Sequence, residues 1–276
     1  MNLFYFGRAV LARATRNQAT LLAAGVSFYF FLSLIPALVA AVSIFGLFLN
    51  PNALESLSKT LIEVLPADAA SLVQNQLEQL ANTGSSSLSF GAIAALVIAF
   101  WGASGGIANL LKAVNFMYET GSQRSYVAGR ALGLALTFGA GLLLVVVIGV
   151  LSARTWVPFF LTDSAVGGHI IEIARWTILI AALGIALTVV FKLAPQSASK
   201  GTPLWLGVGI ATAASVISTA GFSFYVSSFG SYQATYGALA GVIVLLLWIW
   251  IAVWSILAGA CVHAEYEQQD EPFVRR

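Results

Sequence analysis

The sequence predicts an all-α, polytopic membrane bundle of six transmembrane helices, with an amphipathic N-terminal helix and an outer helical cap. Two observations support this fold class. Hydrophobic residues make up 59% of the chain and charged residues only 9%, whereas a soluble domain carries about 25% charged residues. Six long apolar segments also follow one another, and each reaches the roughly 20 residues that a helix needs to cross a bilayer. These segments are residues 21–49, 88–111, 131–152, 171–191, 203–226 and 236–262.

Three further segments complete what we expect to be one integral membrane domain. Residues 1–20 mix apolar side chains with three arginines, which is typical of a helix lying in the membrane interface. A charged flank that only sets topology explains the same pattern. Residues 50–87 form the one long loop, where helical spacing of apolar residues predicts two short helices capping the outer face. Residues 263–276 are expected to form a cytoplasmic tail. The first span is too long for a signal peptide and should remain as an anchor.

The charges of the loops predict the orientation of the bundle. Six spans place both chain ends on the same side, and cytoplasmic loops carry an excess of Lys and Arg. With both ends inside, that side holds ten of the thirteen Lys and Arg residues. Lys59, Arg154 and Arg175 are then the three that lie outside or in the outer halves of spans. We therefore expect cytoplasmic N and C termini.

Polar residues within the spans narrow the function. No predicted span carries Asp, Glu, Lys or His near its middle, which argues against a proton relay and a voltage sensor. The spans carry small and hydroxyl residues instead. In the fifth span these share one helix face, which indicates either helix packing or a cavity lining. Pro36, in the middle of the first span, predicts a kink that is either a static bend or part of a cavity or hinge.

The residues that enzymes use are few and scattered. On the predicted topology His169 lies outside and His263 inside, so the two histidines cannot share a metal or a proton. Cys261 is the single cysteine, which excludes an intrachain disulfide and a cysteine-cluster metal site. The sequence has no Walker-type glycine loop, no nucleophile elbow and no basic aromatic stripe for nucleic acid. We expect no catalytic residues, no metal, no cofactor and no nucleic-acid partner. A membrane enzyme is the weakest alternative, with Glu119 and Glu265 as its candidate acids.

Three stretches together resemble the YihY/BrkB family of bacterial inner-membrane proteins. The first is Ala-Ala-Gly-Val-Ser-Phe-Tyr-Phe-Phe-Leu-Ser-Leu-Ile-Pro at residues 23–36. The second is Trp-Gly-Ala-Ser-Gly-Gly at 101–106, followed by Asn115, Tyr118 and Arg124. The third is Tyr-Gly-Ala-Leu-Ala-Gly at 236–241, followed by Trp248 and by Gly-Ala at 259–260. The resemblance covers essentially the whole chain in order.

The resemblance implies a six-span protein of the bacterial cytoplasmic membrane. The family was once labelled ribonuclease BN, a label now regarded as mistaken, and is otherwise described as transporters or virulence-associated membrane proteins. Some members are linked to export of envelope lipid or small solutes. This chain departs from the family where members often carry an acidic residue and, two positions later, an asparagine. Those positions are Cys261 and His263 here.

These observations predict a transporter or flippase-like protein that moves an amphiphilic lipid or a small zwitterionic solute. The alternative is a scaffold for envelope assembly that binds partners through residues 50–87. The expected partners are the lipid bilayer and the cargo, and the glycine-rich helix faces would also permit an oligomer. The residues expected to line the cargo cavity are aromatic, hydroxyl or amide side chains and one proline: Tyr29, Ser33, Pro36, Trp101, Asn109, Asn115, Tyr118, Tyr225, Tyr236 and Trp248.

Overall fold

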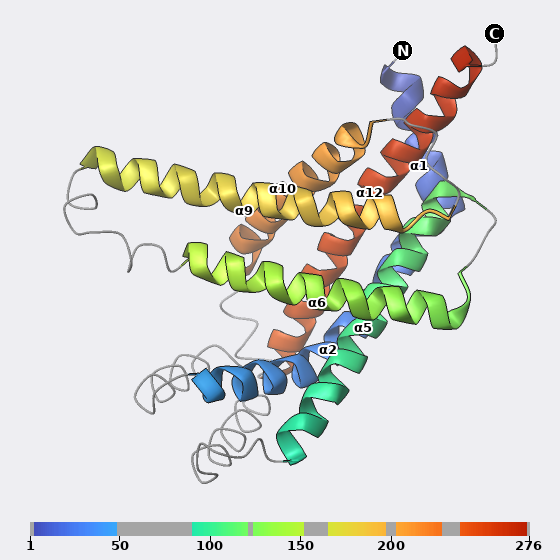
Figure 1. Ribbon diagram of the computed structural model, residues 1–276. Helices are drawn as coiled ribbons and strands as arrows, with labels where there is room; N and C mark the ends of the chain where they lie inside the picture. The colour runs from blue at the N-terminus through green and yellow to red at the C-terminus, as the bar shows by residue number, and fades with distance from the viewer. Residues whose placement is uncertain are drawn as a thin grey trace.

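The computed structural model describes residues 3–48, 90–120, 124–151, 165–196, 203–227 and 238–274. Throughout these residues the chain is helical, apart from short turns, as the sequence predicted. The described helices, in chain order (Figure 1), are α1 (Leu3–Arg16), α2 (Ala19–Phe48), α5 (Phe90–Tyr118), α6 (Tyr126–Leu151), α9 (Ala165–Leu193), α10 (Trp205–Ser227) and α12 (Ala238–Val274).

The membrane character of these helices is clear, but the predicted count of six spans is not confirmed. Within the described residues, four segments are long and apolar enough to cross a bilayer, and the bent pair of α1 and α2 would add a fifth. Helix α5 is not among the four, and its second half carries Asn109, Lys112 and Asn115. The four segments are Tyr126–Leu143, Ile171–Leu193, Trp205–Tyr225 and Gly241–Gln269.

Local sequence signals explain where several helices begin and end. Ser125 precedes α6, and its hydroxyl accepts a hydrogen bond from the backbone N–H of Ala128, as an N-cap does. Gln18 and Glu119 adopt positive φ angles of 52° and 55° at the ends of α1 and α5. This left-handed geometry terminates helices, so the bend of 56° between α1 and α2 follows directly from Gln18.

The C-terminal segment is helical. Helix α12 continues to Val274, so most of the expected tail is a regular continuation of the last span. Glu265, Glu267, Gln268 and Gln269 are good helix formers, and Ala264 is buried against the rest of the bundle. The predicted outer cap at residues 50–87 lies outside the described residues, as does the contact surface that the scaffold alternative requires.

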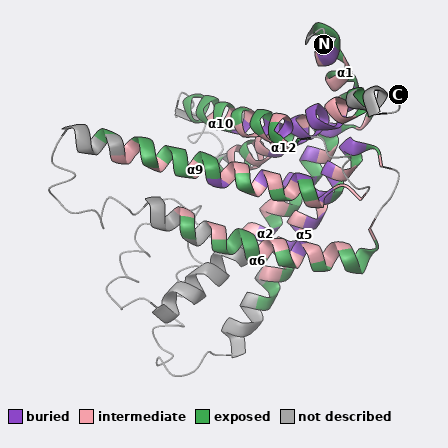
Figure 2. Cartoon of the chain, turned by 45° about the horizontal axis from the view of Figure 1, so that its top comes forward, coloured by how far each residue is buried: buried purple, intermediate pink, exposed green. Residues whose placement is uncertain are grey.

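The helices pack most closely near one end of the bundle. Helix α2 lies along α5, α10 lies along α12, and α12 also contacts α1, α2 and α5. The start of α1 and the end of α12 lie on the same side of the bundle (Figure 1). Figure 2 shows that buried residues gather there, whereas α6 and α9 expose much of their length. Exposed apolar helices are expected where lipid is the solvent.

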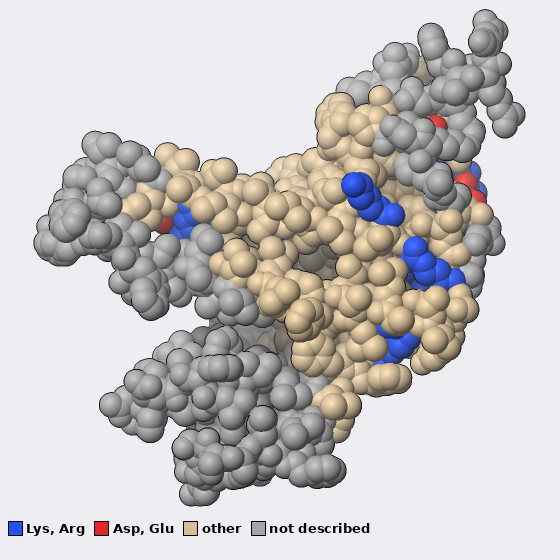
Figure 3. All heavy atoms as spheres, viewed as in Figure 1, with Lys and Arg blue, Asp and Glu red and all other residues tan. Residues whose placement is uncertain are grey.

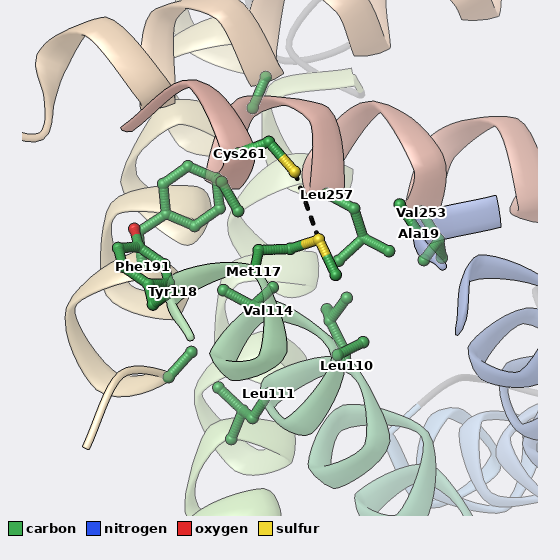
Figure 4. Close-up of a cluster of buried hydrophobic side chains, with 14 of the residues drawn as sticks. Ala19, Leu110, Leu111, Val114, Met117, Tyr118, Phe191, Val253, Leu257 and Cys261 are labelled. Atoms are coloured by element: carbon green, nitrogen blue, oxygen red, sulfur yellow. Dashed lines mark hydrogen bonds between the residues drawn. The ribbon is translucent and has the colours of Figure 1, made fainter. Parts of the chain in front are cut away.

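The core lies where the C-terminal halves of α5 and α12 meet (Figure 4). Val114 and Met117 of α5 and Leu257 and Cys261 of α12 are fully buried there, together with Phe191 of α9. The Cys261 thiol donates to the Met117 sulfur at 3.3 Å. The two side chains form an apolar, fully packed contact between α5 and α12.

Glycines allow the closest helix contacts. A Cβ atom added at Gly259 of α12 would lie 2.5 Å from the Ala211 Cβ and 2.6 Å from the Gly207 carbonyl oxygen of α10. A Cβ atom at Gly133 of α6 would lie 2.7 Å from the Ser104 carbonyl oxygen of α5. Small residues drive helix association in lipid because they let backbones approach. These glycines serve contacts within one chain, and an oligomer formed through glycine-rich faces stays a prediction.

A buried arginine joins α1 to α5 and α12. Arg13 is 0% exposed, and its Nε and Nη2 donate to Glu265 Oε2 at 3.2 and 3.0 Å. Its Nη1 donates to the Met117 carbonyl at 3.1 Å and lies 3.4 Å from Glu119 Oε2. Arg16 also pairs with Glu119, at 2.8 Å. Neither reading of residues 1–20 predicted a buried ion network.

The network gives Glu119 an altered pKa. Burial alone would raise the pKa of Glu119. Hydrogen bonds from Asn17 and Arg16, together with the charges of Arg13 and Arg16, outweigh this effect and hold the pKa below its ordinary value of 4.5. A carboxyl with a lowered pKa stabilises the fold above its ordinary pKa, and this stabilisation is lost as the pH falls through the folded value.

We expect the thermal stability of the purified protein to fall below pH 4.5, with Glu119 contributing to the loss. Glu119→Gln should be less stable at neutral pH and should lose less on acidification, which melting in detergent across this pH range measures. Glu172→Gln, at an exposed pair on α9, is the control and should keep the acid-induced loss. Equal pH profiles for Glu119→Gln and the wild type would contradict the assignment.

Candidate functional site

A cavity of about 390 Å³ lies between α2, α5 and α6. We call it the α2–α5–α6 cavity. It forms where α6 runs across α2 and α5 (Figure 1) rather than along them. Its lining combines aromatic, small, amide and basic side chains: Tyr29, Leu32 and Ser33 from α2; Trp101, Gly102, Gly105, Ala108, Asn109 and Lys112 from α5; and Tyr126, Gly129 and Arg130 from α6.

The pattern of α5 explains why its neighbours come close here. Gly105 and Gly106 follow each other on the face toward α2 and α6. A Cβ at Gly106 would lie 3.1 Å from the Phe30 ring, and one at Gly105 would lie 2.9 Å from Arg130 Nη1. The missing side chains thus admit an aromatic ring of α2 and a guanidinium of α6 against the α5 backbone.

Arg130 is held in place by Trp101. Its Nη2 donates to the Trp101 carbonyl at 2.6 Å, and its Cζ lies 4.3 Å from the centroid of the Trp101 ring. A cation over an indole face gains about 0.5–2 kcal/mol. Arg130 Nε is buried and makes no hydrogen bond among the described residues. The guanidinium is therefore positioned at the cavity with donor capacity to spare.

A second cavity of about 50 Å³ adjoins the first, since both are lined by Ala108, Lys112 and Gly129. It adds Asn115 of α5 and Arg124, which precedes α6. Every charged side chain that lines either cavity is a cation. Figure 3 shows basic residues in blue on the part of the surface where α5 ends and α6 begins.

The structure brings half of the predicted cavity residues to these two cavities. Tyr29, Ser33, Trp101 and Asn109 line the α2–α5–α6 cavity, and Asn115 lines the smaller one. The role that we predicted for them, contact with a cargo, stays a prediction.

The other predicted residues lie elsewhere. Tyr118 is buried, and its hydroxyl lies 3.1 Å from His263 Nδ1. Tyr225 stacks on Phe222 in α10, and Trp248 is 39% exposed on α12. The side chain of Pro36 in α2 and the whole of Tyr236 lie outside the described residues.

Sequence reasoning missed the basic residues of the site. Lys112, Arg124 and Arg130 were counted only as charges that set topology. A signal was present in α5, where Gly105, Asn109 and Lys112 recur at helical spacing and so mark one polar face in an apolar helix. The hydroxyl face of α10 lines neither cavity. Ser218, which is not on the predicted face of Thr212, Ser215, Thr219 and Ser223, lies 3.3 Å from Ser255 of α12.

The acids and histidines that hydrolytic chemistry would need do not line either cavity. Glu119 and Glu265 are ion-paired to Arg13 and face neither cavity. His169 lies near the start of α9 and His263 near the end of α12, and these ends are far apart (Figure 1). In the described part of the chain, no three His, Cys, Asp or Glu side chains are close enough to hold a metal ion.

Comparison with known proteins identifies relatives over almost the full chain. The family model described as virulence factor BrkB matches residues 10–274. A ribonuclease-like protein, YfkH of Bacillus subtilis, is 28% identical over 271 residues, which covers 94% of each chain. A UPF0761 membrane protein of Vibrio campbellii is 26% identical over 96% of this chain and 83% of its own. A UPF0761 membrane protein of Vibrio cholerae is 27% identical over 96% and 88%. No solved structure matches the chain.

Proposed function

Because the chain belongs to the virulence factor BrkB family, whose relatives include bacterial membrane proteins, we propose that it is a transporter or flippase-like protein. Its cargo is an amphiphile that passes through the α2–α5–α6 cavity. The observation that carries the proposal is a polar, aromatic cavity of about 390 Å³ between helices that are otherwise apolar. Ligand pockets in proteins typically measure about 300–1,000 Å³.

The lining suits a molecule with a polar and an apolar part. Tyr29, Leu32 and Trp101 are each about half exposed, at 48%, 52% and 55%, so the aromatic and apolar wall faces outward from the bundle. Asn109 and the two cations supply the polar wall. Polar groups in a membrane bundle are costly and mark substrate pathways by default. This arrangement supports a cavity that an amphiphile enters laterally from the lipid bilayer.

The proposed location is the bacterial cytoplasmic membrane, with both chain ends inside. The ends of α1 and α12 lie on one side of the bundle (Figure 1), and Arg13 links them directly to each other through Glu265. Lys112 and Arg124 lie near the end of α5 and just before the start of α6. Basic residues concentrate on the cytoplasmic side of membrane proteins.

The names of the relatives give only weak support to an enzyme. One relative is called ribonuclease-like, while the family description and the other relatives refer to virulence and to the membrane. Glu119 and Glu265, the acids that a hydrolase would use, neutralise Arg13 instead. Their proposed role is structural.

Liposomes that contain the purified protein should move a fluorescent phospholipid between leaflets faster than empty liposomes, with or without ion gradients. Dithionite, which bleaches only the outer leaflet, measures the rate. Trp101→Ala should lower the rate about tenfold, equivalent to about 1.4 kcal/mol, because it removes the aromatic wall and the support of Arg130. Trp205→Ala, at a position that is 67% exposed and lines neither cavity, is the matched control and should retain the wild-type rate.

Two results would count against the proposal. One is a wild-type protein that moves neither phospholipid nor small solutes above the rate of empty liposomes. The other is an equal loss of rate in Trp101→Ala and Trp205→Ala, which would indicate a general effect on folding rather than on the cavity.

A further inference from the structure

We propose that the α2–α5–α6 cavity binds the anionic, phosphate-type group of a lipid amphiphile through Arg130 and Lys112. This assignment rests on the proposed function, because it concerns the cargo of the same cavity. It narrows the expectation from sequence, an amphiphilic lipid or a small zwitterionic solute, to an anionic amphiphile. The reason is that the cavity does carry fixed charge, and all of it is positive.

The cations of the cavity differ from Arg13 and Arg175 in having no acidic partner within the described residues. Arg13 pairs with Glu119 and Glu265, and Arg175 pairs with Glu172. Within the described ranges, no carboxylate pairs with Lys112, Arg124 or Arg130. Arg130 is half-buried and its Nε makes no hydrogen bond within the described residues; such an unpaired cation in a membrane protein is costly, and a bound anion would offset that cost. The charge balance of the site therefore favours a ligand of negative charge.

The position of Arg130 is suited to an anion held within the bundle. The Trp101 ring and carbonyl that hold it lie near the middle of α5, which runs from Phe90 to Tyr118. A guanidinium has five N–H donors, of which one is bonded to Trp101, and the buried Nε makes no bond within the described residues. The fork of N–H groups matches two oxygens of a phosphate, so the headgroup would bind beside Gly105.

Lys112 provides a second charge on the path to that position. It lines both cavities and lies two helical turns beyond Gly105 toward the end of α5. A flexible ammonium acts as a point charge for phosphate. Lys112 could therefore attract the anion at the cavity mouth, and Arg130 would bind it deeper. The outward-facing Leu32 and Tyr29 leave the apolar side of the cavity for acyl chains, which favours a lipid-borne anion over a free one.

Binding to the detergent-purified full chain tests the assignment. The probes are dihexanoyl-phosphatidylglycerol, which is anionic; dihexanoyl-phosphatidylcholine, which is zwitterionic; and inorganic phosphate. The anionic lipid should bind about tenfold more tightly than the zwitterionic one, and Arg130→Gln and Lys112→Gln should each weaken it about tenfold, as expected for a charge-assisted hydrogen bond. Arg8→Gln, at an exposed position of α1, is the control and should bind as the wild type does.

The outcomes separate the cargo assignment from the proposed function. Equal binding of the two lipids, unchanged in Arg130→Gln and Lys112→Gln, would overturn the anionic assignment while lipid movement in liposomes still stands. Inorganic phosphate that competes as strongly as the anionic lipid would support the anion site and overturn its lipid source. If neither lipid binds and none is moved, the proposed function fails. Lys112 is exposed, so Lys112→Gln should fold and keeps the test decisive if Arg130→Gln does not.

Discussion

Arg13→Gln should lower the free energy of unfolding by about 3–5 kcal/mol, the amount expected when one partner of a buried ion pair is removed. Arg13 is fully buried and donates to Glu265 and to the Met117 carbonyl. Without it, Glu265 and Glu119 keep their negative charges close together, and the Met117 carbonyl loses a hydrogen bond. Arg13 hydrogen-bonds α1 to α12, in addition to the packing of Val10 and Ala14 against the core.

Unfolding by sodium dodecyl sulfate in mixed micelles measures the effect. Arg8→Gln is the matched control, because Arg8 is an exposed arginine of the same helix, and it should change stability by less than about 0.5 kcal/mol. Arg13→Lys should fall between the two, since an ammonium keeps the charge but cannot reach all three acceptors at once. Equal stability of Arg13→Gln and Arg8→Gln would refute the structural role of the network.

Gly259→Leu should separate α10 from α12 and lower the free energy of unfolding by about 1–3 kcal/mol, as overpacking does. Even the Cβ atom of a new side chain would lie 2.6 Å from the Gly207 carbonyl oxygen, and backbone cannot move aside without shifting the helix. Gly207 is equally constrained, with a Cβ position 2.5 Å from the His263 Cβ. The pair of helices would have to repack along the core.

The melting temperature in detergent and the elution profile of the purified protein measure this change. Gly209→Leu is the control on the neighbouring helix α10, because a Cβ at Gly209 would meet nothing within 4 Å. It should melt close to the wild type. A Gly259→Leu protein with wild-type melting would show that α10 and α12 do not pack as closely as described here.

Much of the architecture could be predicted because hydropathy and helix length are local properties. The apolar runs predicted long helices, and every described helix except α1 coincides with one of them. The length of α12 could not be predicted from hydropathy, because its last turns are polar and are held by contacts distant in sequence. Arg13 and Glu265 are 252 residues apart, and no sequence pattern in either segment predicts that they pair.

The site was predictable only in part for a similar reason. Tyr29, Ser33, Trp101 and Asn109 stand out as polar or aromatic groups in apolar helices, which is a local signal. Arg130 stands at the start of a span, where a cation is expected for topology. Arg130 reaches the cavity only because α6 crosses α5. The absence of a side chain at Gly105 lets the Arg130 guanidinium approach the α5 backbone. The electrostatic character of the site thus depends on tertiary structure.

Thiol labelling of residue 109 tests the central claim, a water-accessible and positively charged cavity between α2, α5 and α6, most directly. Asn109→Cys is made in a Cys261→Ala background, which removes the single native thiol, and is treated with membrane-impermeant methanethiosulfonates in sealed vesicles. Phe138→Cys, at a 59% exposed position of α6 outside the cavity lining, is the lipid-facing control and should stay unreactive.

We expect Asn109→Cys to react from the side of the chain ends. An anionic ethylsulfonate reagent should react about tenfold faster than the cationic trimethylammonium reagent, because the cations of the cavity concentrate anions. Arg130→Gln should reduce that ratio. An Asn109→Cys protein as unreactive as Phe138→Cys, or one that prefers the cationic reagent, would contradict the central claim.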